Sequence, residues 1–249
     1  MTRIVICGCC GKMGRVINDI IKSRNDCEVI AGIDLYGDKY DNFPVVKYPN
    51  ELTEKPDVII DFSNPSSLND LLDYALTNGV AVVFATTGYT PEQITAIKSA
   101  ADQIPVFFTF NMSLGINLLV ELAKKATQVL GGQFDIELIE KHHNQKIDAP
   151  SGTAIMIAEA INNELDNSCQ FVYDRHSVRK KREKNEIGIH AVRGGTIVGE
   201  HEVIFAGRDE VITLSHSAAS KEVFAVGSVN AAVFLANKEK GLYAMSDLI

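Results

Sequence analysis

The feature that most constrains the fold is an alternation of short apolar segments with amphipathic segments in the first part of the chain. The apolar segments predict buried strands over 3–7, 29–33, 58–60, 80–84 and 106–108. Apolar residues at helical spacing after position 12 and over 66–78 predict helices, and a capping-box pattern starting at Thr90 predicts a third. Repeated strand–helix units are typical of a Rossmann-like α/β fold with a doubly wound parallel sheet.

A different pattern begins after Asn111. A helix is predicted over 116–130, followed by a half-buried strand in which Phe134, Ile136 and Leu138 alternate with polar residues. A further helix follows Ser151, and strands over 187–193, 196–205 and 211–216 are joined by short turns that predict an antiparallel meander. We therefore expect a second domain of α+β type over 114–220, with an antiparallel or mixed sheet. The apolar helix predicted over 222–235 is expected to return to the first domain, which then comprises 1–113 and 221–249.

Composition excludes several classes of function. The 249 residues carry a net charge of −8, which argues against broad binding to nucleic acid or to an anionic membrane. The basic run over 179–182 is interpreted as a solvated loop, because no aromatic residues are interleaved with it. No apolar run reaches the length of a membrane span, and the five cysteines, an odd number without paired C-x-x-C motifs, favour a reduced cytoplasmic location.

The turn after the first predicted strand has the spacing of a phosphate-binding loop. Gly8, Gly11 and Gly14 follow one another at intervals of three, and backbone N–H groups in such a turn can hold a pyrophosphate. Asp34 closes the second predicted strand, where a carboxylate can accept hydrogen bonds from both ribose hydroxyls and repel a 2′-phosphate. The alternative is a tight turn with Asp34 capping a loop. Cys9 and Cys10 are interpreted as small residues in that turn, with a reactive role as the alternative.

Two further segments carry candidate site residues. Ala85-Thr86-Thr87-Gly88 follows a predicted parallel strand, at the sheet edge where ligands bind, although an ordinary strand–helix turn has the same pattern. His142, His143 and Lys146 precede Pro150-Ser151-Gly152-Thr153, which opens a helix whose N-terminus favours an anion. This segment fits a catalytic group, a metal site or a polar loop. We expect no metal, because adjacent histidine side chains diverge and no second ligand cluster is recognisable.

The whole chain resembles the 4-hydroxy-tetrahydrodipicolinate reductases, also called dihydrodipicolinate reductases, of lysine biosynthesis. The most specific motif is Glu140-x-His142-His143-x-x-Lys146-x-Asp148-Ala149-Pro150-Ser151-Gly152-Thr153-Ala154. Supporting motifs are Gly8-x-x-Gly11-Lys12-Met13-Gly14, Thr86-Thr87-Gly88, Asn111 to Asn117, Arg193-Gly194-Gly195 with Gly199-Glu200-His201, and Gly241-Leu242-Tyr243-x-Met245. The resemblance implies that the protein transfers a hydride to a cyclic imine dicarboxylate. It also implies a homotetramer assembled through the sheets of the substrate domains, and closure of each chain's two domains on the ligand.

The resemblance also implies roles for individual residues. His142 would be the general acid and Lys146 a proton donor, while His143, Lys146, Gly152 and Thr153 would bind the substrate's carboxylates. The implied cofactor-binding residues are Gly8, Cys9, Cys10, Gly11, Lys12, Met13, Asp34, Ala85, Thr86, Thr87, Thr109, Phe110, Asn111 and Met112.

The chain departs from the family pattern at four positions. Ala85 replaces a common glycine, and Lys12 and Lys221 replace common arginines. Leu35 stands where some members have an arginine that helps them accept NADPH, so we expect a preference for NADH, with NADPH as the alternative cofactor. Two other functions fit the nucleotide loop: a different two-domain NAD-dependent dehydrogenase of an amino-acid pathway, and a non-catalytic protein that responds to NAD. Neither explains the histidine–lysine segment as well.

Overall fold

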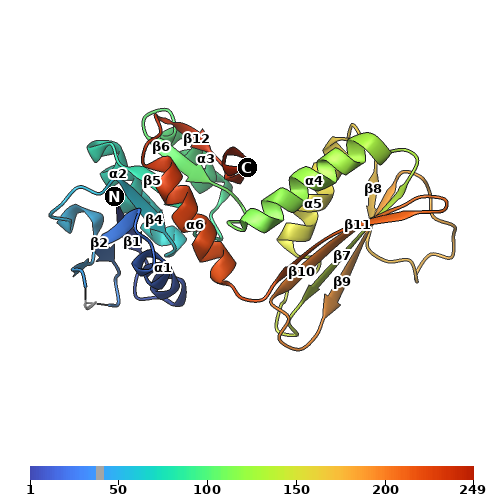
Figure 1. The fold of residues 1–249 in the computed structure, drawn as a ribbon, viewed down its shortest axis with the longest axis horizontal. Coiled ribbons are helices and arrows are strands. Elements are labelled where there is room, and N and C mark those ends of the chain that lie inside the picture. The colour runs from blue at the N-terminus through green and yellow to red at the C-terminus, as the bar shows by residue number, and fades with distance from the viewer. Residues whose placement is uncertain (38–41) are drawn as a thin grey trace. The chain divides into compact units, whose positions relative to one another are not determined.

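The structure is a computed structural model that describes residues 1–37 and 42–249. The chain forms two compact units (Figure 1). The first unit comprises Met1–Leu114 and Glu222–Ile249, and the second comprises Gly115–Lys221. Each boundary lies one residue from the one expected from the sequence, and the last long helix belongs to the first unit.

The first unit contains a sheet in which every pair of neighbouring strands is parallel. Its strands are β1 (Thr2–Cys7), β2 (Cys27–Ile33), β3 (Val45–Val46), β4 (Val58–Asp61), β5 (Ala81–Phe84), β6 (Pro105–Phe108) and β12 (Gly241–Tyr243). The order β12-β6-β5-β4-β1-β2-β3 is that of a doubly wound dinucleotide-binding fold with β12 added beside β6. The predicted fold class is confirmed. The short strands β3 and β12 were not predicted.

Helices cover both faces of this sheet. They are α1 (Lys12–Lys22), α2 (Leu68–Asn78), α3 (Pro91–Ala100) and α6 (Glu222–Leu235), with short 3-10 turns at Pro49–Glu51, Pro65–Ser67 and Met245–Leu248. One apolar core contains side chains of α1 and α6, and a second contains side chains of α2 and α3. The capping box predicted at Thr90 is present, with Gln93 as its partner. In the described part of the chain, no helix has both the length and the apolar character needed to cross a bilayer.

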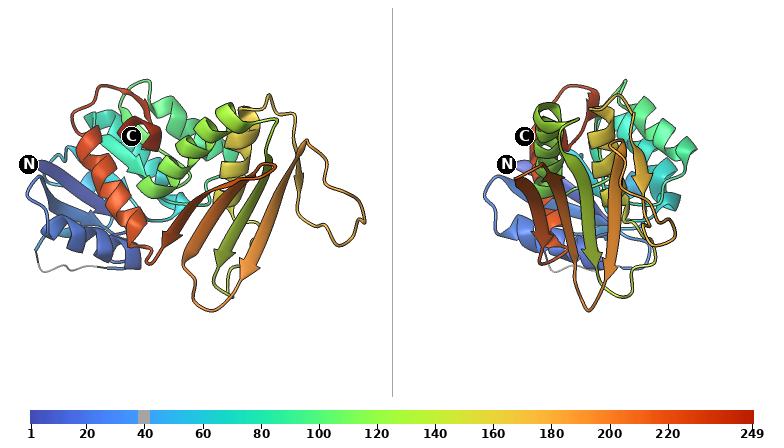
Figure 2. Two further views of the ribbon diagram at one scale, coloured as in Figure 1. Left: turned by 45° about the vertical axis from the view of Figure 1, so that its right-hand side comes forward. Right: turned by 90° about the vertical axis from the view of Figure 1, so that its right-hand side faces the viewer.

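The second unit is a five-stranded mixed sheet with two helices packed on one face (Figures 1 and 2). The strands are β7 (Asp135–His142), β8 (Gln170–Val172), β9 (Glu186–Arg193), β10 (Gly199–Ala206) and β11 (Val211–Ala218), and the helices are α4 (Leu114–Leu130) and α5 (Gly152–Asn163). Alternate residues of β7, beginning with Ile136 and Leu138, face the helices. The same alternation carries Glu140 and His142 to the end of that face, beside the start of α5.

The second half of the predicted antiparallel meander is confirmed, since β10 and β11 form an antiparallel hairpin, but the predicted pairing of β9 with β10 is wrong. The strand order is β11-β10-β7-β9-β8, so β7 lies between β9 and β10, and β9 runs parallel to both of its neighbours. The turn after β9 crosses the end of β7, where Gly194 N–H donates to the His142 carbonyl at 2.9 Å. Local turn signals indicated consecutive strands but could not show that an earlier strand lies between them.

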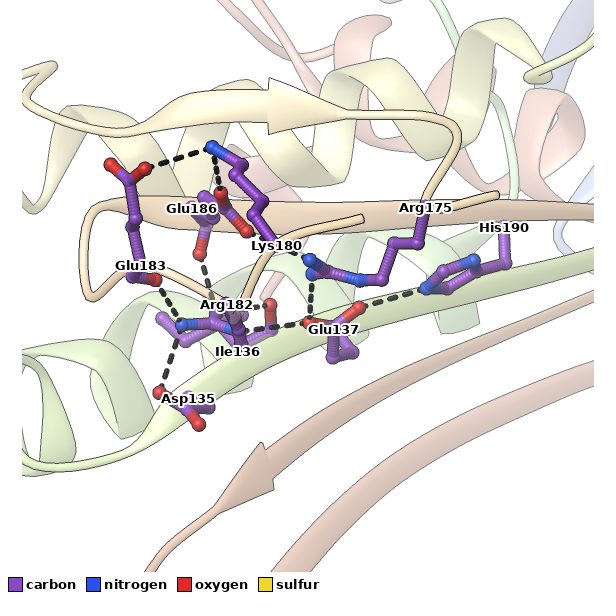
Figure 3. A network of polar contacts seen from close by, with 9 residues as sticks. All are labelled: Asp135, Ile136, Glu137, Arg175, Lys180, Arg182, Glu183, Glu186 and His190. Carbon is purple, nitrogen blue, oxygen red and sulfur yellow. Dashed lines mark hydrogen bonds and ion pairs between the residues drawn. The ribbon is translucent and has the colours of Figure 1, made fainter. Parts of the chain in front are cut away.

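The basic run is not simply a solvated loop. On the outer face of the second unit's sheet, Arg182 donates through Nε to Glu137 at 2.9 Å and through Nη1 to Asp135 at 2.8 Å (Figure 3). Arg175 joins Glu137 to Glu186 at 2.7 and 2.8 Å. Hydrogen bonds from Arg175 and Lys180 lower the pKa of Glu186 to about 2. These ion pairs hold the segment between β8 and β9 against the sheet.

Candidate active site

The glycine turn after β1 packs closely against neighbouring backbone. Gly8 has a φ of +81°, and a Cβ there would lie 2.4 Å from the Phe62 carbonyl oxygen. A Cβ on Gly14 would lie 2.2 Å from the Gly8 carbonyl oxygen, so α1 can start against the turn only with glycine at this position. Gly11 is the N-cap of α1. The first N–H groups of this helix are thus available to an anion, as a pyrophosphate site requires.

Other predicted cofactor residues follow neighbouring parallel strands. Ala85, Thr86 and Thr87 follow β5, and Thr109 to Met112 follow β6, so the carboxyl ends of these strands bring both segments to one sheet edge. Thr86 is buried, and its Oγ1 accepts a hydrogen bond from Ser63 N–H at 2.8 Å. The side-chain oxygen of Asn111, also buried, accepts from Ser113 N–H at 2.8 Å. Ala85 and Met112 are buried, whereas Phe110 is 75% exposed.

Asp34 lies beside the glycine turn and borders a cavity. Its Oδ2 accepts a hydrogen bond from Cys10 N–H at 2.9 Å, and its Oδ1 accepts one from Tyr36 N–H at 3.0 Å. The cavity has a volume of about 280 Å³, and its lining includes Gly8, Gly11, Asp34, Leu35, Tyr36, Lys47, Phe62, Ser63 and Asn64. A glycine-containing turn, a helix N-terminus and a carboxylate at one cavity fit the phosphate and ribose of a dinucleotide.

Sequence reasoning missed a buried carboxylate at the end of β4. The side chain of Asp61 is fully buried, accepts a hydrogen bond from Tyr89 Oη at 2.6 Å, and also accepts from the Ser63 hydroxyl. Burial, followed by the nearby Asp61 charge, raises the pKa of Tyr89 well above its ordinary value. Asp61 therefore joins the segments that follow β4 and β5. The only sequence signal was a charged residue ending an apolar strand.

In the second unit, the carboxylate of Glu140 holds His142. Glu140 is fully buried, and its Oε2 lies 2.6 Å from His142 Nδ1. Arg193 donates to both Glu140 oxygens at 2.7 Å, and Ser151 N–H donates to Oε1 at 3.0 Å. Burial raises the pKa of Glu140, but the hydrogen bonds from Arg193, His142 and Ser151 together lower it by more. The pKa of Glu140 is therefore below its ordinary value. Glu140 is thus an ionised acceptor.

An ionised Glu140 fixes the orientation of the His142 ring. Because a carboxylate can only accept, Nδ1 must carry the proton that is shared with Glu140. Nε2 is then the ring nitrogen that can exchange a proton with a ligand. A Cβ on Gly199 would lie only 3.2 Å from this Nε2, so a larger residue there would press on the ring.

A second histidine, His201, lies beside His142 and is uncharged at neutral pH. His201 is 4% exposed, and its ring lies edge-on to His142 with centroids 5.3 Å apart. Burial, aided by the nearby His142 charge, lowers the pKa of His201 to about 4. Its Nε2 lies 3.1 Å from the Ser151 hydroxyl, which also accepts from Ala154 N–H as the N-cap of α5. His201 therefore supports the start of α5 as an uncharged group.

The remaining predicted residues surround the same helix start. Lys146 Nζ lies 2.8 Å from Asp148 Oδ1, and this contact lowers the pKa of Asp148. The carbonyl of His143 accepts from Lys146 N–H at 3.1 Å, which closes the turn that carries both side chains. Gly152 is the first residue of α5, and among the described residues beyond its chain neighbours and its own helix backbone none places an atom within 4 Å of where its Cβ would be. The Gly152 end of α5 therefore leaves room for a carboxylate.

No role was predicted for Glu140 or Arg193, although both belong to motifs that carry the family resemblance. Glu140 could have been found, because residues two apart on a strand share a face and His142 follows it at that spacing. Arg193 could not, since 53 residues separate it from Glu140 in the chain.

The fold and these groups define an oxidoreductase with a Rossmann-type nucleotide-binding unit and a second unit that carries a histidine–carboxylate pair beside a helix N-terminus. The chain belongs to the dihydrodipicolinate reductase family. Family models described as "Dihydrodipicolinate reductase, N-terminus" and "Dihydrodipicolinate reductase, C-terminus" match residues 2–112 and 115–249. The resemblance seen in the sequence is confirmed.

Full-length relatives agree with this assignment. The chain is 51% identical over 249 residues to a 4-hydroxy-tetrahydrodipicolinate reductase of Caldanaerobacter subterraneus subsp. tengcongensis, covering 100% of the chain and 98% of the relative. It is 46% identical to one of Clostridium novyi, with the same coverage. A solved dihydrodipicolinate reductase from Paenisporosarcina sp. TG-14, described as dipicolinate-bound, has a TM-score of 0.83 and 27% identity, with 100% of both chains covered.

Proposed function

We propose that the chain reduces 4-hydroxy-tetrahydrodipicolinate, or its dehydrated form dihydrodipicolinate, to tetrahydrodipicolinate in the diaminopimelate route to lysine. NADH is the preferred reductant, and NADPH serves less well. The observation that carries the proposal is the ionised Glu140, which holds His142 beside the open N-terminus of α5. A protein that only sensed NAD would have no need of proton donors there.

The first unit supplies cofactor binding. The N–H groups of the turn over 8–13 hold the pyrophosphate, Asp34 accepts from the ribose, and 85–87 with 109–112 contact the nicotinamide end. When bound, the reduced nicotinamide supplies the hydride. Asp61 is a positioning residue. Its carboxylate accepts hydrogen bonds from the Ser63 and Tyr89 hydroxyls, and Ser63 N–H donates in turn to Thr86 Oγ1.

The second unit binds the dicarboxylate and supplies protons. The N–H groups of Gly152 and Thr153 and the side chains of His143 and Lys146 pair with the substrate's carboxylates, since a helix N-terminus and cations both favour anions. His142 donates a proton through Nε2 as general acid, and Lys146 donates through Nζ. Asp148 holds Lys146 near this position at 2.8 Å. Glu140 stabilises the charged imidazole and keeps Nε2 directed at the ligand.

The preference for NADH rests on two residues that border the cavity. Asp34 repels a 2′-phosphate, and its neighbour Leu35 is 48% exposed and offers no positive charge. Lys47 borders the same cavity and is the source of the residual acceptance of NADPH.

The proposed assembly is a cytoplasmic homotetramer formed through the sheets of the second units. Val192 and Val211 support this contact, because both are exposed and their register places them on the sheet face that points away from the helices. Sedimentation velocity of the purified protein is expected to give four times the chain mass of 27.2 kDa. A monomer at all concentrations would contradict the assembly.

The proton-donor role is tested by His142→Gln, which keeps a polar side chain but cannot act as an acid. We expect kcat to fall by about 10²-fold or more, with an unchanged dissociation constant for NADH. The matched control is Gln145→Ala, an exposed residue of the same turn. A wild-type kcat in His142→Gln would show that His142 is not the proton donor.

A further inference from the structure

Two adjacent cysteines and a carboxylate meet at the glycine turn of the first unit. Cys9 and Cys10 lie between Gly8 and Gly11, and Asp34 closes β2 beside them. The sulfur atoms are 3.8 Å apart, and a carboxylate oxygen of Asp34 lies within 4.8 Å of both. Side chains at i and i+1 usually diverge, so convergence of two thiols on a third donor is a specific arrangement.

Glycines make room for both sulfur atoms. A Cβ on Gly32 would lie 2.4 Å from Cys9 Sγ, and a Cβ on Gly37 would lie 2.1 Å from Cys10 Sγ. Any other residue at either position would displace the thiol that packs there. Cys9 is 1% exposed, whereas Cys10 is half-buried, so the pair can be approached from the side of Cys10.

The spacing of the thiols matches a tetrahedral metal site. With zinc–sulfur bonds of about 2.3 Å and tetrahedral angles, two coordinating sulfur atoms stand about 3.8 Å apart. The observed separation is 3.8 Å. Asp34 accepts three backbone hydrogen bonds, from Cys10, Tyr36 and Gly37. An ionised carboxylate has about four acceptor positions, one more than the three bonds that the described residues donate, so it can also bind an ion.

We propose that Cys9, Cys10 and Asp34 bind a Zn²⁺ ion, with water as the fourth ligand. Both thiols bind as thiolates, and each releases its proton to solvent as its sulfur–zinc bond forms. No oxidation or reduction takes place. Two thiolates and a carboxylate supply three negative charges, a donor set that suits zinc better than magnesium or calcium.

The ion and the dinucleotide compete for the same turn. This part of the inference rests on the proposed function, in which Asp34 accepts from the ribose and the turn over 8–13 holds the pyrophosphate. An ion on the Asp34 carboxylate and the Cys10 thiolate occupies the position of the ribose. Zinc binding therefore prevents cofactor binding, and a bound cofactor excludes zinc.

The site is tested directly by titrating the reduced, full-length protein with Cd²⁺, a spectroscopic substitute for Zn²⁺. We expect the ultraviolet sulfur-to-cadmium charge-transfer absorption to saturate at one ion per chain. Cys10→Ser is expected to lose at least half of this absorption and to bind at least about tenfold more weakly. Cys169→Ser, which changes a half-buried cysteine of the second unit, is the matched control and keeps the wild-type titration.

Absence of the absorption in the wild type, or an unchanged titration in Cys10→Ser, would overturn the site. Asp34→Asn leaves both thiols in place and is expected to weaken Cd²⁺ binding by about tenfold; wild-type affinity would remove Asp34 from the ligand set. Circular dichroism verifies that each variant is folded.

Competition is measured separately through the fluorescence of bound NADH. We expect added Zn²⁺ to raise the apparent dissociation constant of NADH in proportion to its concentration, and less so in Cys10→Ser. If zinc and NADH bind together without mutual effect, the competition is wrong. If NADH does not bind at all, the proposed function fails, whereas the Cd²⁺ titration still decides the metal site.

Discussion

The Glu140 carboxylate lies 2.6 Å from His142 Nδ1 and is itself fully buried. Two hydrogen bonds from Arg193 and one from the N–H of Ser151 complete its environment. A buried charge persists only when it is paired and hydrogen-bonded, so this carboxylate is ionised because the fold supplies those partners. The same partners give His142 one orientation and one tautomer, which is what a proton donor needs.

Replacing Glu140 tests this relationship. Glu140→Gln keeps the shape of the side chain but removes the charge that stabilises protonated His142. We expect kcat to fall by roughly 10- to 100-fold, with the pKa of the acidic group in the kcat profile shifted downward. Affinity for NADH should stay within about twofold, because Glu140 lies in the second unit.

The matched control is Glu121→Gln, which removes an exposed carboxylate that pairs with Lys124 on α4. It should leave kcat and its pH profile unchanged. A Glu140→Gln protein with the wild-type pH profile would show that Glu140 serves stability alone.

The cofactor preference depends on charge at the ribose. The ratio of kcat/KM for NADH to that for NADPH should exceed about 10 in the wild type, since Asp34 repels a 2′-phosphate. Leu35→Arg adds a positive charge beside the same cavity and should shift this ratio toward NADPH by about tenfold or more. Leu35→Gln, of similar length but uncharged, is the control. Equal or better efficiency with NADPH in the wild type would refute the preference.

Burial of His201 predicts a pH-dependent loss of stability. Its pKa falls from 6.5 to about 4 on folding. Below pH 6.5 the unfolded chain takes up a proton that the folded chain does not, so stability is lost as pH falls toward 4. This histidine alone should lower the free energy of unfolding by about 2 kcal/mol between pH 7 and pH 5.

Urea unfolding at both pH values measures this effect. His201→Asn should show a smaller loss between pH 7 and pH 5 than the wild type, whatever its stability at pH 7. His176→Asn, in an exposed segment, is the control and should keep the wild-type difference. An equal loss in the wild type and His201→Asn would show that His201 does not cause it.

The sequence predicted most of the first unit because its signals are local. Apolar runs, the glycine turn and the capping box at Thr90 each lie within a few residues, and each marks an element in the structure. Strands β3 and β12, of two and three residues, are too short to leave a pattern.

The second unit was harder to predict, because the contacts that determine its strand order join residues that are far apart in the sequence. The insertion of β7 between β9 and β10 depends on pairing across the sheet, which turn residues do not encode. Likewise, the motif placed Glu140 near His142, but only the fold brings Arg193 and His201 to them. The roles of His142 and Lys146 stay predictions.

The most direct measurement combines the purified protein with the condensation product of pyruvate and aspartate semialdehyde and follows the oxidation of NADH. The wild type should oxidise NADH at rates typical of enzymes, about 1–10³ s⁻¹. Lys146→Ala removes both a carboxylate partner and a proton donor, so its turnover should fall by about 10²- to 10⁴-fold. Asn144→Ala, in the same turn, should keep the wild-type rate. A folded wild type that leaves NADH unoxidised, or full turnover in Lys146→Ala, would contradict the account.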